Sequence, residues 1–213
     1  MSYSTIGAIS LNISFLLYVI HYFPQLIHNQ RDGQLQQLSL NFHYLLGFCY
    51  LADLNYGYGL GLPWQYRLVS WVGVLCLIVQ HFQLTKVYKH LRSFKWVSCL
   101  LALMTGMTFY ALYTEFSPSY YSAMGYLAHV TGLFFFLPQI IKNYRQPAAL
   151  SLSISFLLLD WICYFCDNVS AWSLAWPLPS KIGAFVGLIL LSILILQWLV
   201  TSRRQSLEIF AHG

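Results

Sequence analysis

Long apolar runs alternate with short polar segments along almost the whole chain. Seven of these runs approach the roughly 20 residues that an α-helix needs to cross the hydrocarbon core of a bilayer. They cover residues of about 5–26, 39–60, 67–88, 96–114, 120–141, 150–168 and 181–200. Little sequence remains for a soluble domain. The pattern predicts an all-α polytopic membrane protein with seven transmembrane helices.

A short sequence with a proline and a glutamine at its centre occurs twice. Residues 22–29 read YFPQLIHN, and residues 136–143 read FLPQIIKN. After a polar stretch, each copy is followed by Leu-Ser-Leu, at 38–40 and at 150–152, where a new apolar run opens. The chain therefore contains two related halves.

The repeats predict how the seven helices are grouped. We assign residues 1–92 to a first three-helix repeat, 93–114 to a linker helix, and 115–213 to a second three-helix repeat with a short tail. Because one extra helix separates them, the two repeats run in the same direction through the membrane. This 3+1+3 order of parallel repeats is typical of SWEET-type transporters.

The proline of each copy predicts a break in an apolar helix, because proline removes a backbone hydrogen bond and kinks the chain. The amide of the next residue, glutamine, can satisfy the backbone groups that are freed. Two such pairs at matching places are typical of a carrier whose halves rock about a central site. We therefore predict that Pro24, Gln25, Pro138 and Gln139 form paired gate hinges.

Composition supports the membrane assignment, and charge sets the orientation. Hydrophobic residues make up 58% of the chain and charged residues 8%, whereas about a quarter of a typical soluble domain is charged. With seven spans, nine basic residues fall on one side of the membrane, against Arg67 and Lys181 on the other. The positive-inside rule places the C-terminus in the cytosol and the N-terminus outside, or in a lumen. The net charge of +5 thus indicates membrane anchoring and no nucleic acid partner.

The doubled Pro-Gln motif, with an asparagine four residues after each glutamine, resembles the PQ-loop transporter family, which is related to the SWEET transporters. The second half is most similar to cystinosin, the lysosomal cystine/proton carrier. Residues 136–143 resemble its second PQ loop, 157–161 a helix with an acidic residue used in proton coupling, and 179–183 the start of its last helix. The resemblance implies proton coupling at Asp160 and substrate contact at Lys181. The chain departs from cystinosin where Ala128 and Phe135 replace lysines and where Ser192 replaces an acid.

Asp160 is the strongest candidate on physical grounds as well. Its predicted position is near the middle of a membrane helix, where an unpaired charge is costly and ionisable residues are usually functional. A carboxylic acid there is protonated when dry and ionised when water or a cation reaches it, which is the behaviour that proton coupling needs. The alternative is a permanently neutral acid that hydrogen-bonds a neighbouring helix.

Two more acids and one lysine are candidates. Asp167 lies seven residues after Asp160, on nearly the same helix face, and is predicted near the outer mouth, where it is either a substrate contact or a solvated helix end. Asp53 is a second candidate for proton coupling, although an interhelical hydrogen bond also explains it. Superposing the repeats on Leu-Ser-Leu places Asp53 opposite Phe165. Lys181 either binds a substrate carboxylate or extends to the membrane interface without a ligand.

Three further residues complete the predicted substrate site: Asn143, His129 and Tyr126. His129 lies one turn after Tyr126 in the fifth run and either lines a cavity or hydrogen-bonds another helix. Histidines at metal-site spacing are absent from the sequence, and so are phosphate loops and nucleophile–base motifs. We therefore expect no enzyme activity and no cofactor, with the proton as coupling ion.

These features predict a secondary active transporter that moves a small polar solute, an amino acid or a derivative such as cystine, by proton-coupled alternating access. The alternatives are a SWEET-like sugar uniporter and a cargo receptor like the KDEL receptor. Two full repeats in one chain permit a working monomer. The lipid bilayer and the solute are the expected partners. The membrane is either a bacterial inner membrane or that of an acidic organelle.

Overall fold

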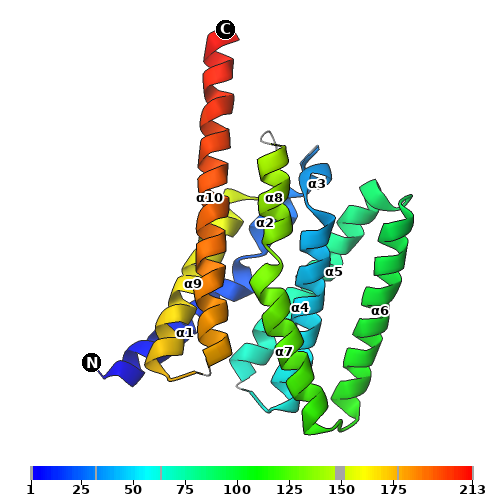
Figure 1. Ribbon diagram of the computed structural model, residues 1–213, viewed down its shortest axis with the longest axis vertical. Coiled ribbons are helices and arrows are strands. Elements are labelled where there is room, and N and C mark those ends of the chain that lie inside the picture. The colour runs from blue at the N-terminus through cyan, green and yellow to red at the C-terminus, as the bar shows by residue number, and fades with distance from the viewer. Residues whose placement is uncertain (1, 32, 63, 147–151, 177, 213) are drawn as a thin grey trace. The chain divides into compact units, whose positions relative to one another are not determined.

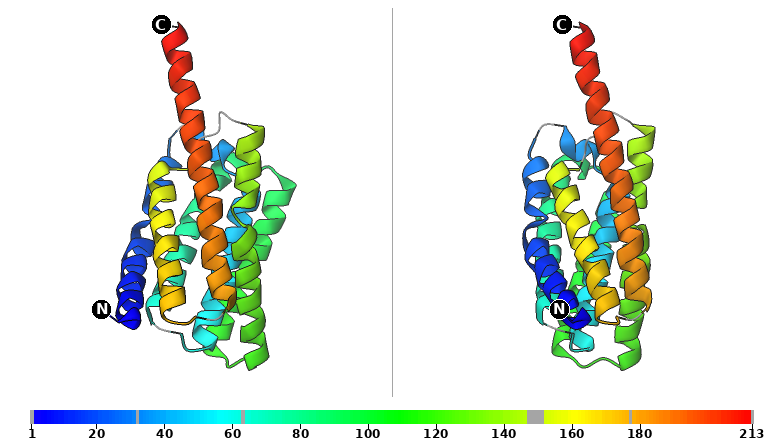
Figure 2. Two further views of the ribbon diagram at one scale, coloured as in Figure 1. Left: turned by 60° about the vertical axis from the view of Figure 1, so that its left-hand side comes forward. Right: turned by 90° about the vertical axis from the view of Figure 1, so that its left-hand side faces the viewer.

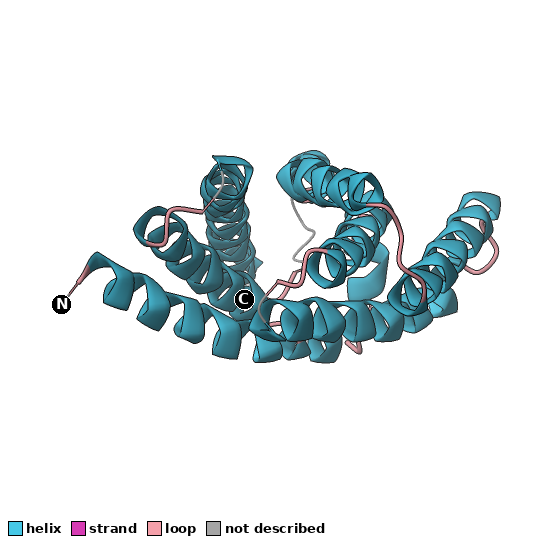
Figure 3. Cartoon of the chain, turned by 90° about the horizontal axis from the view of Figure 1, so that it is seen from below, coloured by secondary structure: helices cyan, strands magenta, loops and turns pink. Residues whose placement is uncertain are grey.

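The computed structural model of the chain describes residues 2–31, 33–62, 64–146, 152–176 and 178–212. Within these ranges every regular element is a helix, and Figure 3 shows helices joined by short loops. The all-α prediction is confirmed. The helices are α1 (Tyr3–Ile20), α2 (Phe23–His28), α3 (Gln34–Gln37), α4 (Leu40–Gly59), α5 (Trp64–Tyr88), α6 (Arg92–Tyr113), α7 (Pro118–Phe134), α8 (Leu137–Arg145), α9 (Ile154–Ser173) and α10 (Leu178–His212).

Each Pro-Gln motif begins a new helix after a two-residue break. The first break separates α1 from α2, and the second separates α7 from α8. Pro24 and Pro138 both stand in the first turn of the short helix that follows, where the missing backbone N–H has no helical partner to lose. The predicted interruption of both apolar helices is therefore confirmed.

The described residues contain six helical segments that are long and apolar enough to cross a membrane, counting α1 with α2 and α7 with α8 as single spans. The predicted second span forms α4, which at 20 residues is as long as α9 but is not among the six. It carries His43, Asp53 and Asn55 within its apolar sequence. With α4 included, the described residues contain seven helical segments of 20 residues or more, in the predicted order.

Two helix boundaries differ from the prediction. The sixth span, expected at 150–168, is α9 at Ile154–Ser173; Leu150 and Ser151 lie outside the described residues. Asp160 and Asp167 consequently lie on opposite sides of the middle of α9, each within about 5 Å of it along the axis. The last helix, α10, continues past the predicted end at residue 200 and extends beyond α8 and α9 (Figure 2).

The helices form two compact units that do not coincide with the sequence repeats. Unit 1 comprises residues 1–42 and 136–213, and unit 2 comprises residues 43–135. The chain passes between them twice, at Phe42–His43 and at Phe135–Phe136. Each unit draws helices from both halves of the sequence. This division does not test the predicted repeat boundaries, which stay a prediction.

In unit 1, α9 packs against α1 on one side and α10 on the other (Figure 1). Small residues allow α1 and α9 to approach closely, as is common between membrane helices. A Cβ atom on Gly7 would lie 2.8 Å from Ser173 Cβ. Ser170 Oγ donates to the Gly7 carbonyl at 3.1 Å, and Ser10 Oγ donates to the Cys166 carbonyl at 2.9 Å.

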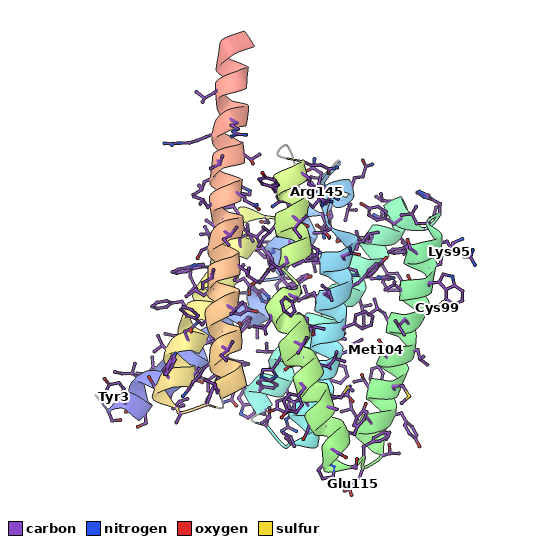
Figure 4. The ribbon with its side chains drawn as sticks, in the orientation of Figure 1. Tyr3, Lys95, Cys99, Met104, Glu115 and Arg145 are labelled. Carbon is purple, nitrogen blue, oxygen red and sulfur yellow. The ribbon has the colours of Figure 1, made fainter. Side chains whose placement is uncertain are left out.

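In unit 2, a buried apolar cluster of Leu51, Leu54 and Val74 joins α4 to α5. Met104 of α6 packs against this cluster. Figure 4 shows Met104 on the inner side of α6, with Lys95 and Cys99 on its outer side. Of the six apolar spans, α6 buries the smallest share of its length.

A tyrosine ring packs onto a glycine at equivalent places in the two halves. A Cβ atom on Gly73 would lie 2.3 Å from the Tyr50 ring, and one on Gly187 would lie 2.1 Å from the Tyr164 ring. The two tyrosines are 114 residues apart, and so are the two glycines. Both contacts fix the distance between the second and third helices of a repeat.

We predict that Gly73→Ala and Gly187→Ala each lower the free energy of unfolding by about 1–3 kcal/mol, because the ring must move to admit the methyl group. Gly106→Ala and Gly183→Ala are the matched controls, since a Cβ atom at either position meets nothing within 4 Å. The controls should leave stability unchanged or raise it slightly, because alanine favours helix. Thermal unfolding in detergent measures all four, and equal effects in both pairs would contradict the packing described.

Candidate functional site

The two Pro-Gln glutamines exchange hydrogen bonds between the repeats. Gln25 Oε1 accepts the Ser153 backbone N–H at 2.8 Å. Gln139 Oε1 accepts the Ser39 backbone N–H at 2.7 Å. Both glutamines are almost completely buried. Each glutamine thus holds the N-terminus of the helix that follows the other copy of the motif.

This exchange provides an acceptor for the backbone N–H group at the start of each of the two helices. Ser153 is the N-cap of α9, and its side chain makes no cap hydrogen bond. In an ordinary capping box, a glutamine or glutamate in the same helix reaches back to the N-cap N–H. Here Gln25 supplies that acceptor from the other repeat. The carboxamide nitrogen of each glutamine donates to the asparagine four residues later, at 2.7 Å in both copies.

These contacts fix the register of the repeat. Gln25 and Gln139 are 114 residues apart, and so are their partners Ser153 and Ser39. The superposition on Leu-Ser-Leu is therefore wrong by two residues, because Ser39 corresponds to Ser153 and not to Ser151. In the correct register Asp53 lies opposite Asp167.

Asp53, in unit 2, is held by two hydroxyl groups of α5. It accepts hydrogen bonds from the Tyr66 hydroxyl and, at 2.6 Å, from Ser70 Oγ. The two donors stand four residues apart, about one helical turn. Both carboxyl oxygens are thus engaged within the protein.

Asp167, in unit 1, has an equivalent arrangement with donors from α1. It accepts from Ser14 Oγ at 2.6 Å and from the Tyr18 hydroxyl at 2.8 Å. Again a serine and a tyrosine four residues apart provide the donors. The geometry of Asp53 and Asp167 favours the interhelical hydrogen bonds that the sequence left as an alternative.

Lys181 also has a repeated counterpart. Its Nζ lies 4.7 Å from the centre of the Trp172 ring, and Arg67 Cζ lies 5.0 Å from the centre of the Tyr58 ring. Both members of these pairs are related by 114 residues. A cation over an aromatic face stabilises each hairpin between the second and third helices. This placement accounts for Lys181 without a substrate, so its substrate role stays a prediction.

Asp160 differs from the other two acids of the membrane helices. It is 4% exposed, and it accepts no hydrogen bond from the described part of the chain. His21 is the basic group beside it, with Nε2 4.0 Å from Asp160 Oδ1. The separation exceeds that of a direct hydrogen bond. A small movement or a bridging water would join the two groups.

The hydrogen bonds of His21 define which nitrogen faces the acid. His21 Nδ1 lies 2.6 Å from the Tyr18 carbonyl, and a carbonyl only accepts, so Nδ1 carries a proton. In the neutral ring Nε2 is then unprotonated, and its lone pair is available toward Asp160. The ring is 2% exposed and stacks on Phe156, with centroids 5.7 Å apart.

Neither member of this pair is repeated. In the 114-residue register Asp160 corresponds to Leu46, and His21 corresponds to Phe135. Sequence reasoning selected Asp160 but not His21. Both are polar residues whose counterparts in the other repeat are apolar. We take the Asp160–His21 pair as the centre of the candidate site.

The remaining predicted residues have contacts of their own. Asn143 accepts from Gln139 and donates to Gln197 Oε1 at 3.2 Å, so it joins α8 to α10. His129, in unit 2, has Nδ1 2.6 Å from the Gly125 carbonyl of its own helix. Tyr126 is 69% exposed on α7. Asn143 shares unit 1 with the Asp160–His21 pair but does not contact it. Among the described residues, no three His, Cys, Asp or Glu side chains are grouped to hold a metal ion.

Comparison with known protein families finds the PQ loop repeat twice, at residues 6–66 and 120–180. The two matches begin 114 residues apart and together cover more than half of the chain. The fold is similar to a solved structure of a eukaryotic SWEET transporter, with a TM-score of 0.58 and 15% sequence identity over 94% of this chain and 99% of that one. No curated protein sequence matches significantly. The likeness to cystinosin stays a prediction.

We predict that Gln25→Met and Gln139→Met each lower the free energy of unfolding by about 1–3 kcal/mol, because each leaves a buried backbone N–H without an acceptor. The two effects should be similar, since the two contacts are equivalent. Gln146→Met is the control, because this glutamine is exposed. Thermal unfolding in detergent provides the comparison. A loss in only one of the two variants would contradict the reciprocal exchange.

Proposed function

The chain belongs to the PQ-loop repeat family, and from this we propose that it is a secondary transporter that couples a small polar solute to protons by alternating access. It is an integral membrane protein with the helical fold of SWEET transporters. The proposed solute is an amino acid or a derivative such as cystine. The observation that carries the proposal is the Asp160–His21 pair, which lies within the membrane helices and has no counterpart in the other repeat.

The chemistry of the pair suits proton coupling. A proton on the Asp160 carboxyl can pass to His21 Nε2, because His21 Nδ1 is already occupied by its own proton. The transfer converts two neutral groups into a carboxylate and an imidazolium about 4 Å apart. Such a carboxylate can also receive an ammonium group, which every amino acid carries. Proton and solute would therefore compete for, or share, one buried acid.

The points at which the chain passes from one unit to the other lie close to the second Pro-Gln motif. At the first, Ser39 and Phe42 precede the passage into unit 2, and at the second, Phe136 and Gln139 follow the return. The Phe42 and Phe136 rings stack with centroids 5.9 Å apart, and the Ser39–Gln139 hydrogen bond lies beside them. We propose that Pro24 and Gln25 with Pro138 and Gln139 act as the hinges, and that kinking there exposes Asp160 to each side of the membrane in turn. If the outer compartment is acidic, net transport runs into the cytosol.

A SWEET-like sugar uniporter is the second candidate, and the likeness of fold favours it. Uniport needs no titratable group, so it leaves the Asp160–His21 pair without a role. The two candidates differ in their response to a proton gradient. Sugar uniport proceeds equally with and without one.

We predict that cystine added to proteoliposomes with an outward-acidic gradient drives proton entry, which an entrapped pH dye records. Asp160→Asn should abolish this entry, because the amide cannot bind or release the proton. Asp167→Asn, on the same helix, should retain it, since Asp167 is engaged by two hydroxyl groups. Proton entry that persists in Asp160→Asn would refute the proposal. So would transport of glucose and not of cystine, at a rate that does not depend on the proton gradient.

We predict a narrower defect for His21→Asn. The asparagine amide can replace Nδ1–H toward the Tyr18 carbonyl, but it offers no titratable atom toward Asp160. Proton-driven uptake of labelled cystine should fall, whereas exchange of labelled for unlabelled cystine at equal pH should persist. Loss of both activities together would show that His21 has a structural role only.

A further inference from the structure

Unit 2 contains a cavity of about 300 Å³ between α4, α5 and α6. Its walls are largely apolar and include Leu51, Leu77 and Leu101. The small residues Gly47 and Ala102 line it and leave the space unfilled. Ile78 and Phe82 at its edge are 39% and 68% exposed, so the cavity is a groove that opens to the surface of the unit.

The polar side chains in the groove are already paired within the protein. His43 Nε2 lies 3.0 Å from His81 Nδ1, and His81 Nε2 lies 2.9 Å from Ser98 Oγ. Ser98 and Thr105 donate to backbone carbonyls one turn earlier in α6, at 2.7 and 2.8 Å. The groove therefore offers a ligand apolar surface and few open hydrogen-bonding positions. An acyl chain suits it better than a polar solute does.

One end of the groove is bordered by basic residues. Lys86 lies four residues, about one helical turn, after Phe82 on α5. Lys95 lies three residues before Ser98 on α6, so it stands at the outer border of the groove-lining face and one turn beyond the end of the lining residues. Figure 4 shows Lys95 at that end of α6, directed outward. Within the described residues none of the basic side chains in this segment forms an ion pair. The segment carries four exposed cations, Lys86, Lys89, Arg92 and Lys95.

We infer that this groove binds an anionic phospholipid, with an acyl chain between α5 and α6 and the phosphate at Lys86 and Lys95. The apolar wall of the groove matches the acyl chain of a phospholipid, and the basic end matches its phosphate. Basic pockets between membrane helices on the cytoplasmic side bind anionic lipid headgroups in this way, and the predicted orientation places this end in the cytosol. The inference is independent of the transported solute.

The bound lipid would fill the space beside α6, the least buried of the apolar spans. Lipid in a fixed position there replaces packing that the helix lacks within the protein. We therefore expect the anionic lipid to stabilise unit 2 against unfolding.

The test compares palmitoyl-oleoyl phosphatidylglycerol with the corresponding phosphatidylcholine as probes. Native mass spectrometry of the full chain in detergent measures retained lipid, and thermal unfolding measures stabilisation. Lys86→Gln with Lys95→Gln should weaken phosphatidylglycerol binding by about 30-fold, because each cation near an anionic lipid contributes a factor of about five. Arg203→Gln with Arg204→Gln is the control, since it removes equal charge from the distal part of α10.

A second pair of variants tests the groove itself. Ala102→Leu fills it and should prevent retention of the lipid, whereas Cys99→Leu, on the outer side of α6, should not. If Ala102→Leu does not fold, the test rests on lipid retention by the Lys86→Gln, Lys95→Gln variant alone. Equal loss in the lysine and arginine pairs, equal retention of both lipids by the unaltered protein, or phosphatidylglycerol retention by folded Ala102→Leu would each overturn the inference.

Discussion

The reciprocal hydrogen bonds from Gln25 and Gln139 to the N-termini of α9 and α4 are the constraint on which the rest of the arrangement depends. Each motif interrupts a helix within or near the membrane, where every backbone polar group needs a partner. The glutamines provide such a partner for the helix of the other repeat. The N–H groups of Ser39 and Ser153 each find their acceptor in the other repeat, which gives a physical reason for two copies in one chain.

The 114-residue register then separates residues that build the fold from residues that carry chemistry. Paired features occur twice: the glutamine contacts, the tyrosine–glycine packing and the cation–π hairpins. A feature that appears in both halves is explained by the fold alone. Asp160 and His21 have apolar counterparts, and they lie beside each other. A buried polar pair that the symmetric fold does not require calls for a functional explanation.

The sequence predicted the helices, their order and both breaks, because apolar length and proline act locally. It did not predict that α1 packs against α9, since a repeat invites pairing within each half. The sequence also aligned Asp53 with the wrong residue of the second repeat, because the repeats were superposed on Leu-Ser-Leu and not on the two prolines. Ser153, which caps α9, lies two residues after the serine of the second Leu-Ser-Leu. The length of α10 was missed because its polar end lacks the apolar signal. His21 required knowledge of contacts across the repeats.

A continuous series of contacts connects Asp160, through α9 and the first Pro-Gln motif, back to His21. His21 is the first residue of the break between α1 and α2, and Gln25 is the third residue of α2. Gln25 holds the Ser153 N–H at the start of α9, and α9 carries Asp160 two turns later, back beside His21. Charge separation between Asp160 and His21 would draw α1 and α9 together at this point. The strain then falls on the break between α1 and α2, because the helices on either side are rigid. In the proposed mechanism, a change of protonation would therefore act directly on a Pro-Gln junction, without a longer path through the protein.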